Sequence, residues 1–272
     1  MTLLDTGTED LLAEVDDGVA VLTMNRPDRR NAMSEAMMTA MERVLTEVEV
    51  DDSVGCVMLT GAGGAFCAGG DVKAMAERPA GERRQTLDAV IHRQRVRQRA
   101  TSGRLWHMPK PTIAAISGPA AGAGLSLALA CDLRYAVEGA VLTTAFARVG
   151  FSGDYGGTWF LTRLVGSAKA KELYYFSDRL TAADAERLGI VNAVFPVADF
   201  DIEVQQRARR LAAGPRLAYR YMKENLNRAV SGELGECMDI EATHHIHTGL
   251  TDDHREAAKA FVERREPRFA GR

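Results

Sequence analysis

The chain has 272 residues, of which 46% are hydrophobic and 26% charged, and its formal net charge is −3 at pH 7. This composition is typical of a globular protein, and the charge gives no reason to expect nucleic acid or an anionic membrane as a partner. No apolar run reaches the ~18 residues that a membrane span needs. The N-terminal segment lacks the basic and apolar regions of a signal peptide, so we expect a cytoplasmic protein.

The first elements along the chain are an antiparallel hairpin and a helix. Two largely apolar segments, Leu11–Val15 and Val19–Met24, flank an Asp-Gly pair that can supply a tight turn, which predicts the hairpin. Ser34 is a plausible N-cap, and the apolar residues that follow it recur at helical spacing over about four turns. The apolar run Val54–Thr60 then predicts a short strand that ends at Gly61.

A pattern of strand, glycine-rich turn and helix occurs twice. Gly63–Gly70 leads into a predicted helix over Asp71–Glu77, and Ser117–Gly122 leads into one over Ala123–Ala130. Further along, Thr181 begins a capping box for another helix. Small residues let a ligand approach the main chain, and a helix start presents unpaired N–H groups. Two such turns could each direct one N–H at the same oxygen, which is the geometry of an oxyanion hole.

Two regions differ from this pattern. Arg78–Gly103 is strongly basic and predicts an exposed, partly mobile helix, and its run Arg83–Arg104 could either contact phosphates or form a solvated surface. Beyond about residue 203 only amphipathic helical stretches follow, namely 203–213, 216–229, 235–247 and 252–265. We therefore predict an α/β core over residues 1–202 and a C-terminal helical oligomerisation region over residues 203–272.

Neither the cysteines nor the histidines form a convincing metal site. The cysteines are scattered and mostly in apolar company, which favours reduced, buried thiols over a disulfide framework: Cys56, Cys67, Cys131 and Cys237. Glu241 precedes a histidine cluster on one predicted helix. There His244 and His247 share a face while His245 points elsewhere, so we interpret the cluster as a polar face or subunit contact. No metal is predicted.

Several motifs, taken in order, resemble those of the crotonase (enoyl-CoA hydratase/isomerase) superfamily. The motifs are spread over nearly the whole chain, and they are Asn25–Ala32, Ala65–Asp71, Gly118–Gly124, Gly156–Thr158 and Ala260–Phe269. The resemblance implies a spiral of ββα units with a C-terminal helical lobe. It also implies an acyl-CoA thioester as substrate, no cofactor other than the coenzyme A that the substrate carries, and a homotrimer or homohexamer.

The resemblance also assigns roles to residues. It makes the backbone N–H groups of Ala68 and Ala123 the oxyanion donors that hold the thioester oxygen. The residues that it places around the substrate are Arg26, Ala65, Cys67, Gly70, Asp71, Val72, Gly122, Ser126, Phe146, Trp159 and Phe269. At the C-terminus, Arg264, Arg265 and Phe269 could reach the adenine and phosphates or form ordinary surface.

Departures from the family pattern bear on the reaction. Hydratases of the family use two glutamates to hold and activate water, and these positions fall on Ser126 and Phe146 here. What remains is Asp154, which is either a general base or the cap of the helix that begins near Gly156. The Asp-x-Gly-Gly-Thr-Trp pattern around it resembles the ring-1,2-epoxyphenylacetyl-CoA isomerase type. Because a 1,3-proton shift needs only one base, we favour a double-bond isomerase with Asp154 as the single general acid/base.

Three alternatives stay open at this point. One is an enoyl-CoA hydratase that adds water to a trans-2-enoyl-CoA, and another is a non-catalytic acyl-CoA-binding subunit. A third is an aryl-CoA dehalogenase, in which the aspartate attacks an aromatic ring. That chemistry also uses a tryptophan where this chain has Phe146, and a histidine at a spacing that His92 and His107 do not match.

Overall fold

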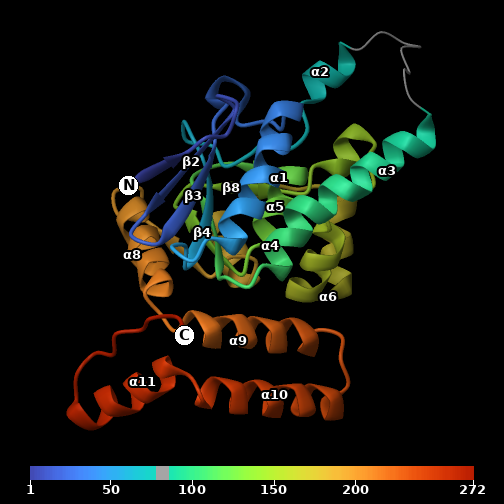
Figure 1. Cartoon of the computed structure of the whole chain (residues 1–272). Helices are drawn as coiled ribbons and strands as arrows, with labels where there is room; N and C mark the ends of the chain where they lie inside the picture. The colour runs from blue at the N-terminus through green and yellow to red at the C-terminus, as the bar shows by residue number, and fades with distance from the viewer. Residues whose placement is uncertain (78–85) are drawn as a thin grey trace.

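The architecture is seen in a computed structural model that describes residues 1–77 and 86–272 (Figure 1). Its main sheet has seven strands, in the order β1 (Thr2–Leu4), β2 (Leu11–Asp16), β3 (Val19–Met24), β4 (Cys56–Gly61), β5 (Thr112–Ile116), β7 (Leu133–Val137) and β10 (Ala193–Phe195). The first three strands are antiparallel, and the sheet is parallel from β3 to β10. A second, three-stranded sheet consists of β6 (Ala120–Ala121), β8 (Val141–Thr143) and β9 (Leu180–Thr181).

Eleven α-helices are found in the described residues: α1 (Glu35–Val50), α2 (Val72–Ala76), α3 (Leu87–Gln98), α4 (Arg104–His107), α5 (Ala123–Ala130), α6 (Gly157–Phe176), α7 (Ala182–Arg187), α8 (Phe200–Ala212), α9 (Arg216–Ala229), α10 (Leu234–Gly249) and α11 (Asp252–Glu263). Short 3-10 turns cover Pro27–Arg29 and Phe146–Val149, and a π-helical turn over Arg99–Gly103 joins α3 to α4. None of the described helices combines the length and the apolar character that a membrane crossing requires.

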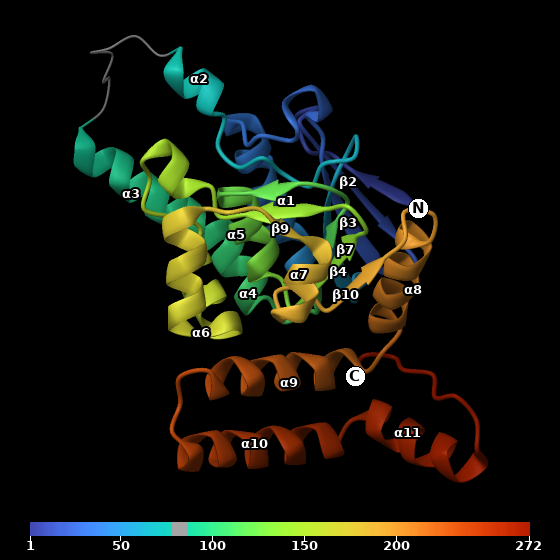
Figure 2. The ribbon, with the colours of Figure 1, turned by 180° about the vertical axis from the view of Figure 1, so that it is seen from behind.

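The central strands are buried on both faces, which explains why they are continuous apolar runs rather than alternating ones. In β4, Val57 and Leu59 belong to the core shared with α1, α5 and α6. Cys56 and Met58 point to the opposite face, where they pack with the apolar side of α8. Figures 1 and 2 show α8 on the other side of the sheet from α1. The core therefore has a helix layer on each side of the parallel strands.

The local signals in the sequence are confirmed. The predicted hairpin is β2–β3, and its turn uses positive φ angles at Asp17 (48°) and Gly18 (76°). Ser34 caps α1 by accepting a bond from the Met37 N–H at 3.0 Å, and Thr181 caps α7. The strand that was expected over Val54–Thr60 begins two residues later, as β4. All four cysteines are free.

The predicted domain boundary at residue 203 falls inside α8. Since α8 covers one face of the sheet, the helices that stand apart from it are α9, α10 and α11, which form a separate layer below the core (Figures 1 and 2). The basic segment forms the expected exposed helix from Leu87 onward, as α3. The end of the predicted helix, Arg99–Gly103, is the π-helical turn, and there the expectation of exposure is wrong because Thr101 and Ser102 are buried. The beginning of the prediction, including Arg83 and Arg84, lies in residues 78–85, outside the described part of the chain.

The buried side chain of Lys223 links α9 to the core. The Lys223 ammonium donates to the carbonyls of Leu105 and Lys110 at 3.0 and 3.1 Å and lies 2.8 Å from the Asp132 carboxylate. Asp132 in turn accepts bonds from the main chain and hydroxyl of Thr112, the first residue of β5. Because these groups are largely shielded from water, losing the ammonium would leave several acceptors unsatisfied.

We expect Lys223→Met to lower the free energy of unfolding by about 2–4 kcal/mol, since removing one partner of a buried pair exposes the full desolvation cost of the other. Urea titration at fixed protein concentration measures this change. The matched control is Lys169→Met, whose partner Glu172 lies on an exposed helix face, and it should change stability by less than about 0.5 kcal/mol. Equal effects of the two substitutions would contradict an anchoring role for Lys223.

Candidate active site

The first glycine-rich turn, residues 62–70 after β4, is held from two sides by main-chain hydrogen bonds. On one side the Met33 N–H donates to the Gly69 carbonyl at 2.8 Å. On the other, the Ala121 N–H of β6 donates to the Cys67 carbonyl at 2.9 Å. The buried Asn31 amide adds bonds to the carbonyls of Ala62 and Ala65, at 2.8 and 2.7 Å. These contacts fix the path of the turn before any ligand arrives.

The second turn, residues 117–122 before α5, packs directly on the first. A Cβ atom at Gly118 would lie 2.0 Å from the Gly64 carbonyl oxygen, and one at Gly124 would lie 2.4 Å from that of Cys67. Only glycine permits this approach. At Gly69, where φ is +83°, a Cβ atom would lie 3.1 Å from the Ala123 nitrogen. The two turns thus meet at Gly69 and Ala123.

The structure corrects the first of the two predicted oxyanion donors. The Ala68 N–H already donates to the Arg30 carbonyl at 2.9 Å, so it is not available to a ligand. Among the described residues, no group accepts a hydrogen bond from the N–H of Gly70 or Ala123. Because Gly69 turns the chain through a positive φ, the available N–H comes two residues later than the sequence pattern indicated. The donor pair that this geometry offers is Gly70 and Ala123.

Arg26 and Asp71, which the resemblance places around the substrate, support the first turn. Their side chains form an ion pair at 3.4 Å, and the Asp71 carboxylate accepts the Ala74 N–H at 3.0 Å, which caps α2. The Ala74 N–H, followed by the Arg26 guanidinium, lowers the pKa of Asp71. Ala65 and Cys67 are buried beneath the turn, whereas Val72 is exposed at the start of α2.

Asp154 lies in the loop between the 3-10 turn over Phe146–Val149 and α6. Its neighbours Gly153, Tyr155 and Gly156 all have positive φ angles, of 116°, 49° and 76°. The N-cap of α6 is Gly156, and no side chain caps that helix. The interpretation of Asp154 as a helix cap is therefore wrong. Instead its Oδ1 atom is buried with no hydrogen-bond partner among the described residues, and this burial raises the pKa of Asp154 to about 6.

The surroundings of the Asp154 carboxyl locate it between the first turn and α6. Its charge raises the pKa of the Cys67 thiol, and likewise the pKa values of the Tyr155 and Tyr174 hydroxyls, in each case after the larger effect of burial. Cys67 is the residue against which Gly124 of α5 packs. Geometry brings the segment that follows Asp154 against α5, because a Cβ atom at Gly157 would lie 2.2 Å from Ser126 Oγ.

The two positions that lack glutamate are occupied by buried, non-ionisable side chains. The Ser126 hydroxyl donates to the Gly122 carbonyl at 3.3 Å. The Phe146 ring stacks on Tyr174, with centroids 5.8 Å apart and planes at 7°. Trp159 lies on the first turn of α6, where it packs edge-on against Trp106 at 5.1 Å and is 37% exposed.

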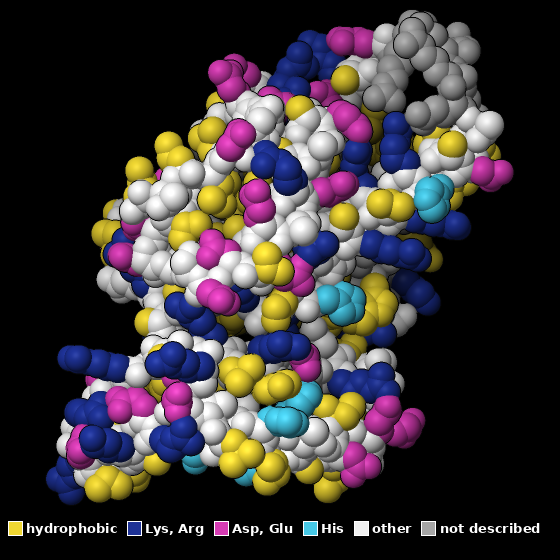
Figure 3. Space-filling view, viewed as in Figure 1, with side chains coloured by type: hydrophobic (Ala, Val, Ile, Leu, Met, Phe, Trp, Pro, Cys, Tyr) yellow, Lys and Arg dark blue, Asp and Glu magenta, His cyan; other side chains and the backbone are white. Residues whose placement is uncertain are grey.

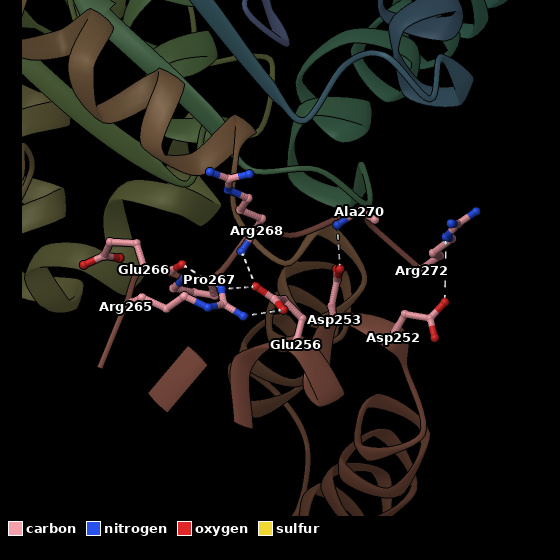
Figure 4. Close-up of a pocket in the computed structure, with 9 residues that line it drawn as sticks. All are labelled: Asp252, Asp253, Glu256, Arg265, Glu266, Pro267, Arg268, Ala270 and Arg272. Carbon is pink, nitrogen blue, oxygen red and sulfur yellow. Dashed lines mark hydrogen bonds and ion pairs between the residues drawn. The ribbon is translucent and has the colours of Figure 1, made fainter. Parts of the chain in front are cut away.

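Phe269 is not brought to Asp154 within one chain. Its neighbours Arg268 and Ala270 donate backbone bonds to Glu256 and Asp253 of α11, at 3.0 and 2.6 Å. This C-terminal segment and α11 line a separate, open pocket of about 720 Å³ (Figure 4). In that pocket the Arg265 guanidinium pairs with Glu256 at 2.6 Å, so it does not face the turns.

The histidine cluster shows no metal-site geometry. Within residues 1–77 and 86–272, no group of three or more candidate ligands could hold a metal ion. His244 stacks on Tyr221 with ring centroids 4.3 Å apart and bonds to the Asn225 amide at 2.6 Å, which joins α10 to α9.

Comparison with known proteins identifies the family. A family model described as enoyl-CoA hydratase/isomerase matches residues 14–272. The 1,2-epoxyphenylacetyl-CoA isomerase of Escherichia coli (strain K12) is 36% identical over 97% of this chain and 99% of its own length. A probable enoyl-CoA hydratase of Rhodobacter capsulatus is 34% identical over 95% of this chain and 97% of its own.

Among solved structures, the enoyl-CoA hydratase from Bacillus anthracis superposes with a TM-score of 0.88 at 31% identity. The match covers 97% of this chain and all of that one. This likeness confirms the expected crotonase-like α/β spiral with its C-terminal helices.

Proposed function

Because this chain belongs to the enoyl-CoA hydratase/isomerase family, we propose that it is a double-bond isomerase of acyl-CoA thioesters. The observations that support the proposal are the buried Asp154 Oδ1 atom, which has no hydrogen-bond partner in the described chain, and the free main-chain N–H groups of Gly70 and Ala123. In this proposal Gly70 and Ala123 hold the thioester oxygen, and Asp154 is the only proton carrier. The reaction uses the coenzyme A of the substrate and needs no redox group.

The proposed cycle moves one proton and one double bond. The Asp154 carboxylate removes a proton from Cα or Cγ, and the C–H electron pair shifts through the conjugated carbons onto the carbonyl oxygen. The resulting enolate oxygen is stabilised by the N–H groups of Gly70 and Ala123. The protonated Asp154 then returns the proton to the other carbon, which restores the carbonyl and the carboxylate. A pKa of about 6 suits both halves of this cycle at neutral pH.

The alternative from the same family is water addition, since relatives named as hydratases also match over nearly the whole chain. Against it stand the side chains at the two glutamate positions. A serine hydroxyl and a phenyl ring cannot hold a water molecule and exchange its protons as two carboxylates can. A subunit that binds acyl-CoA without catalysis is the alternative from another class.

We expect the Asp154→Asn substitution to slow the exchange of substrate α and γ protons with deuterated water by about 10²–10⁴-fold, which is the usual contribution of a general base. Binding of the acyl-CoA should persist, because the amide has the same shape. In the unchanged enzyme the exchange rate should rise with pH and level off above about 6, since only the carboxylate can accept a proton. Proton NMR in deuterated buffer measures both effects.

The same assay separates the alternatives. Loss of enoyl absorbance with crotonyl-CoA would identify a hydratase, and absence of both signals despite binding would identify a non-catalytic subunit. Full exchange in the Asp154→Asn variant would exclude the single-base mechanism.

A pair of glycines tests the contact between the turns. Gly69 and Gly64 have similar positive φ angles of 83° and 75°, so alanine strains the backbone comparably at both. Only at Gly69 does the added Cβ approach the second turn, 2.7 Å from the Ala121 oxygen, whereas at Gly64 it meets nothing within 4 Å. We expect Gly69→Ala to slow proton exchange about 100-fold and Gly64→Ala to leave it within about threefold. Similar losses in both variants would argue against the proposed oxyanion pair.

We also propose that copies of this chain assemble through the α9–α11 layer as a homotrimer or homohexamer in the cytoplasm. Large apolar side chains are exposed along this layer (Figure 3): Met222, Leu226, Leu234, Met238, Ile246, Leu250, Phe261 and Val262. Such a surface favours self-association. Light scattering of the full chain should give three or six times the mass of 29.6 kDa, and Leu226→Asp should lower it. A monomeric mass would overturn the assembly.

A further inference from the structure

The direction of the free Gly70 N–H is set by the peptide group to which it belongs. That peptide group also contains the Gly69 carbonyl, which accepts a hydrogen bond from the Met33 N–H at 2.8 Å. In a trans peptide group the N–H and C=O bonds point in opposite directions, and no cis peptide bond occurs in the described residues. The bond from Met33 therefore turns the Gly70 N–H away from residues 32–33 and holds it there.

The same relation continues one step further, to a cation. The Met33 N–H shares its peptide group with the Ala32 carbonyl, and this carbonyl accepts a hydrogen bond from Nη1 of Arg26 at 2.6 Å. The hydrogen bonds are all donated in the same sense, from the guanidinium towards Gly70. This hydrogen-bond series begins at Arg26, passes through the 32–33 and 69–70 peptide groups, and ends at the free Gly70 N–H.

Two carboxylates hold the Arg26 guanidinium in this position. Its Nη2 atom lies 3.4 Å from the Asp71 carboxylate and its Nε atom 3.6 Å from that of Asp10, and only 20% of the Arg26 side chain is exposed. Asp10 is fixed in turn by the Ser34 hydroxyl, which donates to it. Because Asp71 directly follows Gly70, the ion pair also ties the guanidinium to the far end of the series.

We propose that Arg26 is a positioning residue for the oxyanion donor Gly70, acting through this hydrogen-bond series. The proposal rests on the proposed function and extends it to a side chain that the resemblance places around the substrate. In this proposal the effect of Arg26 on the reaction passes through the protein, two peptide groups away from the thioester oxygen.

A cation at the start of such a series strengthens the donor at its end. A hydrogen bond donated by a charged group is roughly twice as strong as a neutral one, and each bond in a series strengthens the next by about 10–30%. The Gly70 N–H thus becomes a better donor to the enolate oxygen than an isolated amide. Since Asp10 and Asp71 reduce the long-range field of Arg26, its effect depends on the bonded route.

The second oxyanion donor has a different support. The Ala123 N–H shares its peptide group with the Gly122 carbonyl, which accepts hydrogen bonds from the N–H and the hydroxyl of Ser126, at 3.0 and 3.3 Å. Both of these donors are neutral and belong to α5 itself. Arg26 therefore acts on only one member of the oxyanion pair.

Removing the guanidinium tests the series. Loss of a whole oxyanion donor costs about 10²–10³-fold in rate, and Arg26→Met leaves the Gly70 N–H in place but weaker and less well directed. We therefore expect this variant to lower the maximal rate of substrate proton exchange about 10–100-fold, with less than about a threefold change in KM. Arg26→Lys keeps the charge and one donor, so it should lose less than Arg26→Met.

The matched control is Arg29→Met, three residues further along the same segment. It removes the same charge close to the site, but from an exposed side chain that takes no part in the series, so it should keep the parental rate. A parental rate in Arg26→Met would overturn the proposal, and so would equal losses in Arg26→Met and Arg29→Met. A loss that appears only in KM would do so as well, since it would indicate a binding contact.

A second measurement does not depend on turnover. Butyryl-CoA that is isotopically labelled at the thioester carbonyl reports the strength of the donors through its infrared stretching frequency, which falls when the oxygen accepts stronger hydrogen bonds. We expect binding to lower this frequency equally in the parental protein and in Arg29→Met, and less in Arg26→Met.

The infrared result separates failure of the positioning role from failure of the isomerase proposal. An equal shift in all three proteins would refute the role of Arg26, whatever reaction the enzyme catalyses. No shift in the parental protein would refute the oxyanion pair and the positioning role together. The expected shifts without any proton exchange would refute only the isomerase.

Discussion

A carboxyl oxygen without a hydrogen-bond partner, enclosed by apolar and aromatic groups, is the constraint on which the candidate site depends. Burying such a group costs free energy unless it is paired, and Asp154 is not paired within the described chain. The loop around it also holds Tyr155 at a positive φ of 49°, which costs free energy in a residue with a Cβ atom. The fold tolerates both costs because large buried clusters on either side of the sheet hold α5 and α6 in place.

The oxyanion donors depend on a different kind of support. Several carbonyls of the first turn already accept hydrogen bonds, from the Met33 N–H, the Asn31 amide and the backbone of β6. Segments distant in sequence thus supply a rigid frame, and the reacting groups themselves contribute little to it. The supporting groups already have hydrogen-bond partners, whereas the groups that would act on a substrate do not. This arrangement is preorganised, because the donors need not move when a ligand binds.

Much of this could be predicted from sequence, because the signals were local. The hairpin, the Ser34 and Thr181 caps, and the strand-turn-helix pattern each depend on a few adjacent residues, and Asp154 was identified from its motif. The prediction of Ala68 as the first oxyanion donor was wrong, because a single positive φ at Gly69 decides which N–H group is free. Lys223 could not be found, since its partners come from segments distant along the chain. The boundary near residue 203 likewise depended on whether α8 packs on the sheet.

The crowding above Gly157 has an evolutionary consequence. A methyl group there would overlap both the Ser126 and the Tyr174 hydroxyl oxygens, so these three positions are sterically interdependent. A descendant lineage could gain a side chain at position 157 only after losing at least the serine hydroxyl, and the order of substitutions would be fixed by volume rather than by chemistry. Covariation among these positions is thus expected wherever a glycine begins this helix beneath a tyrosine.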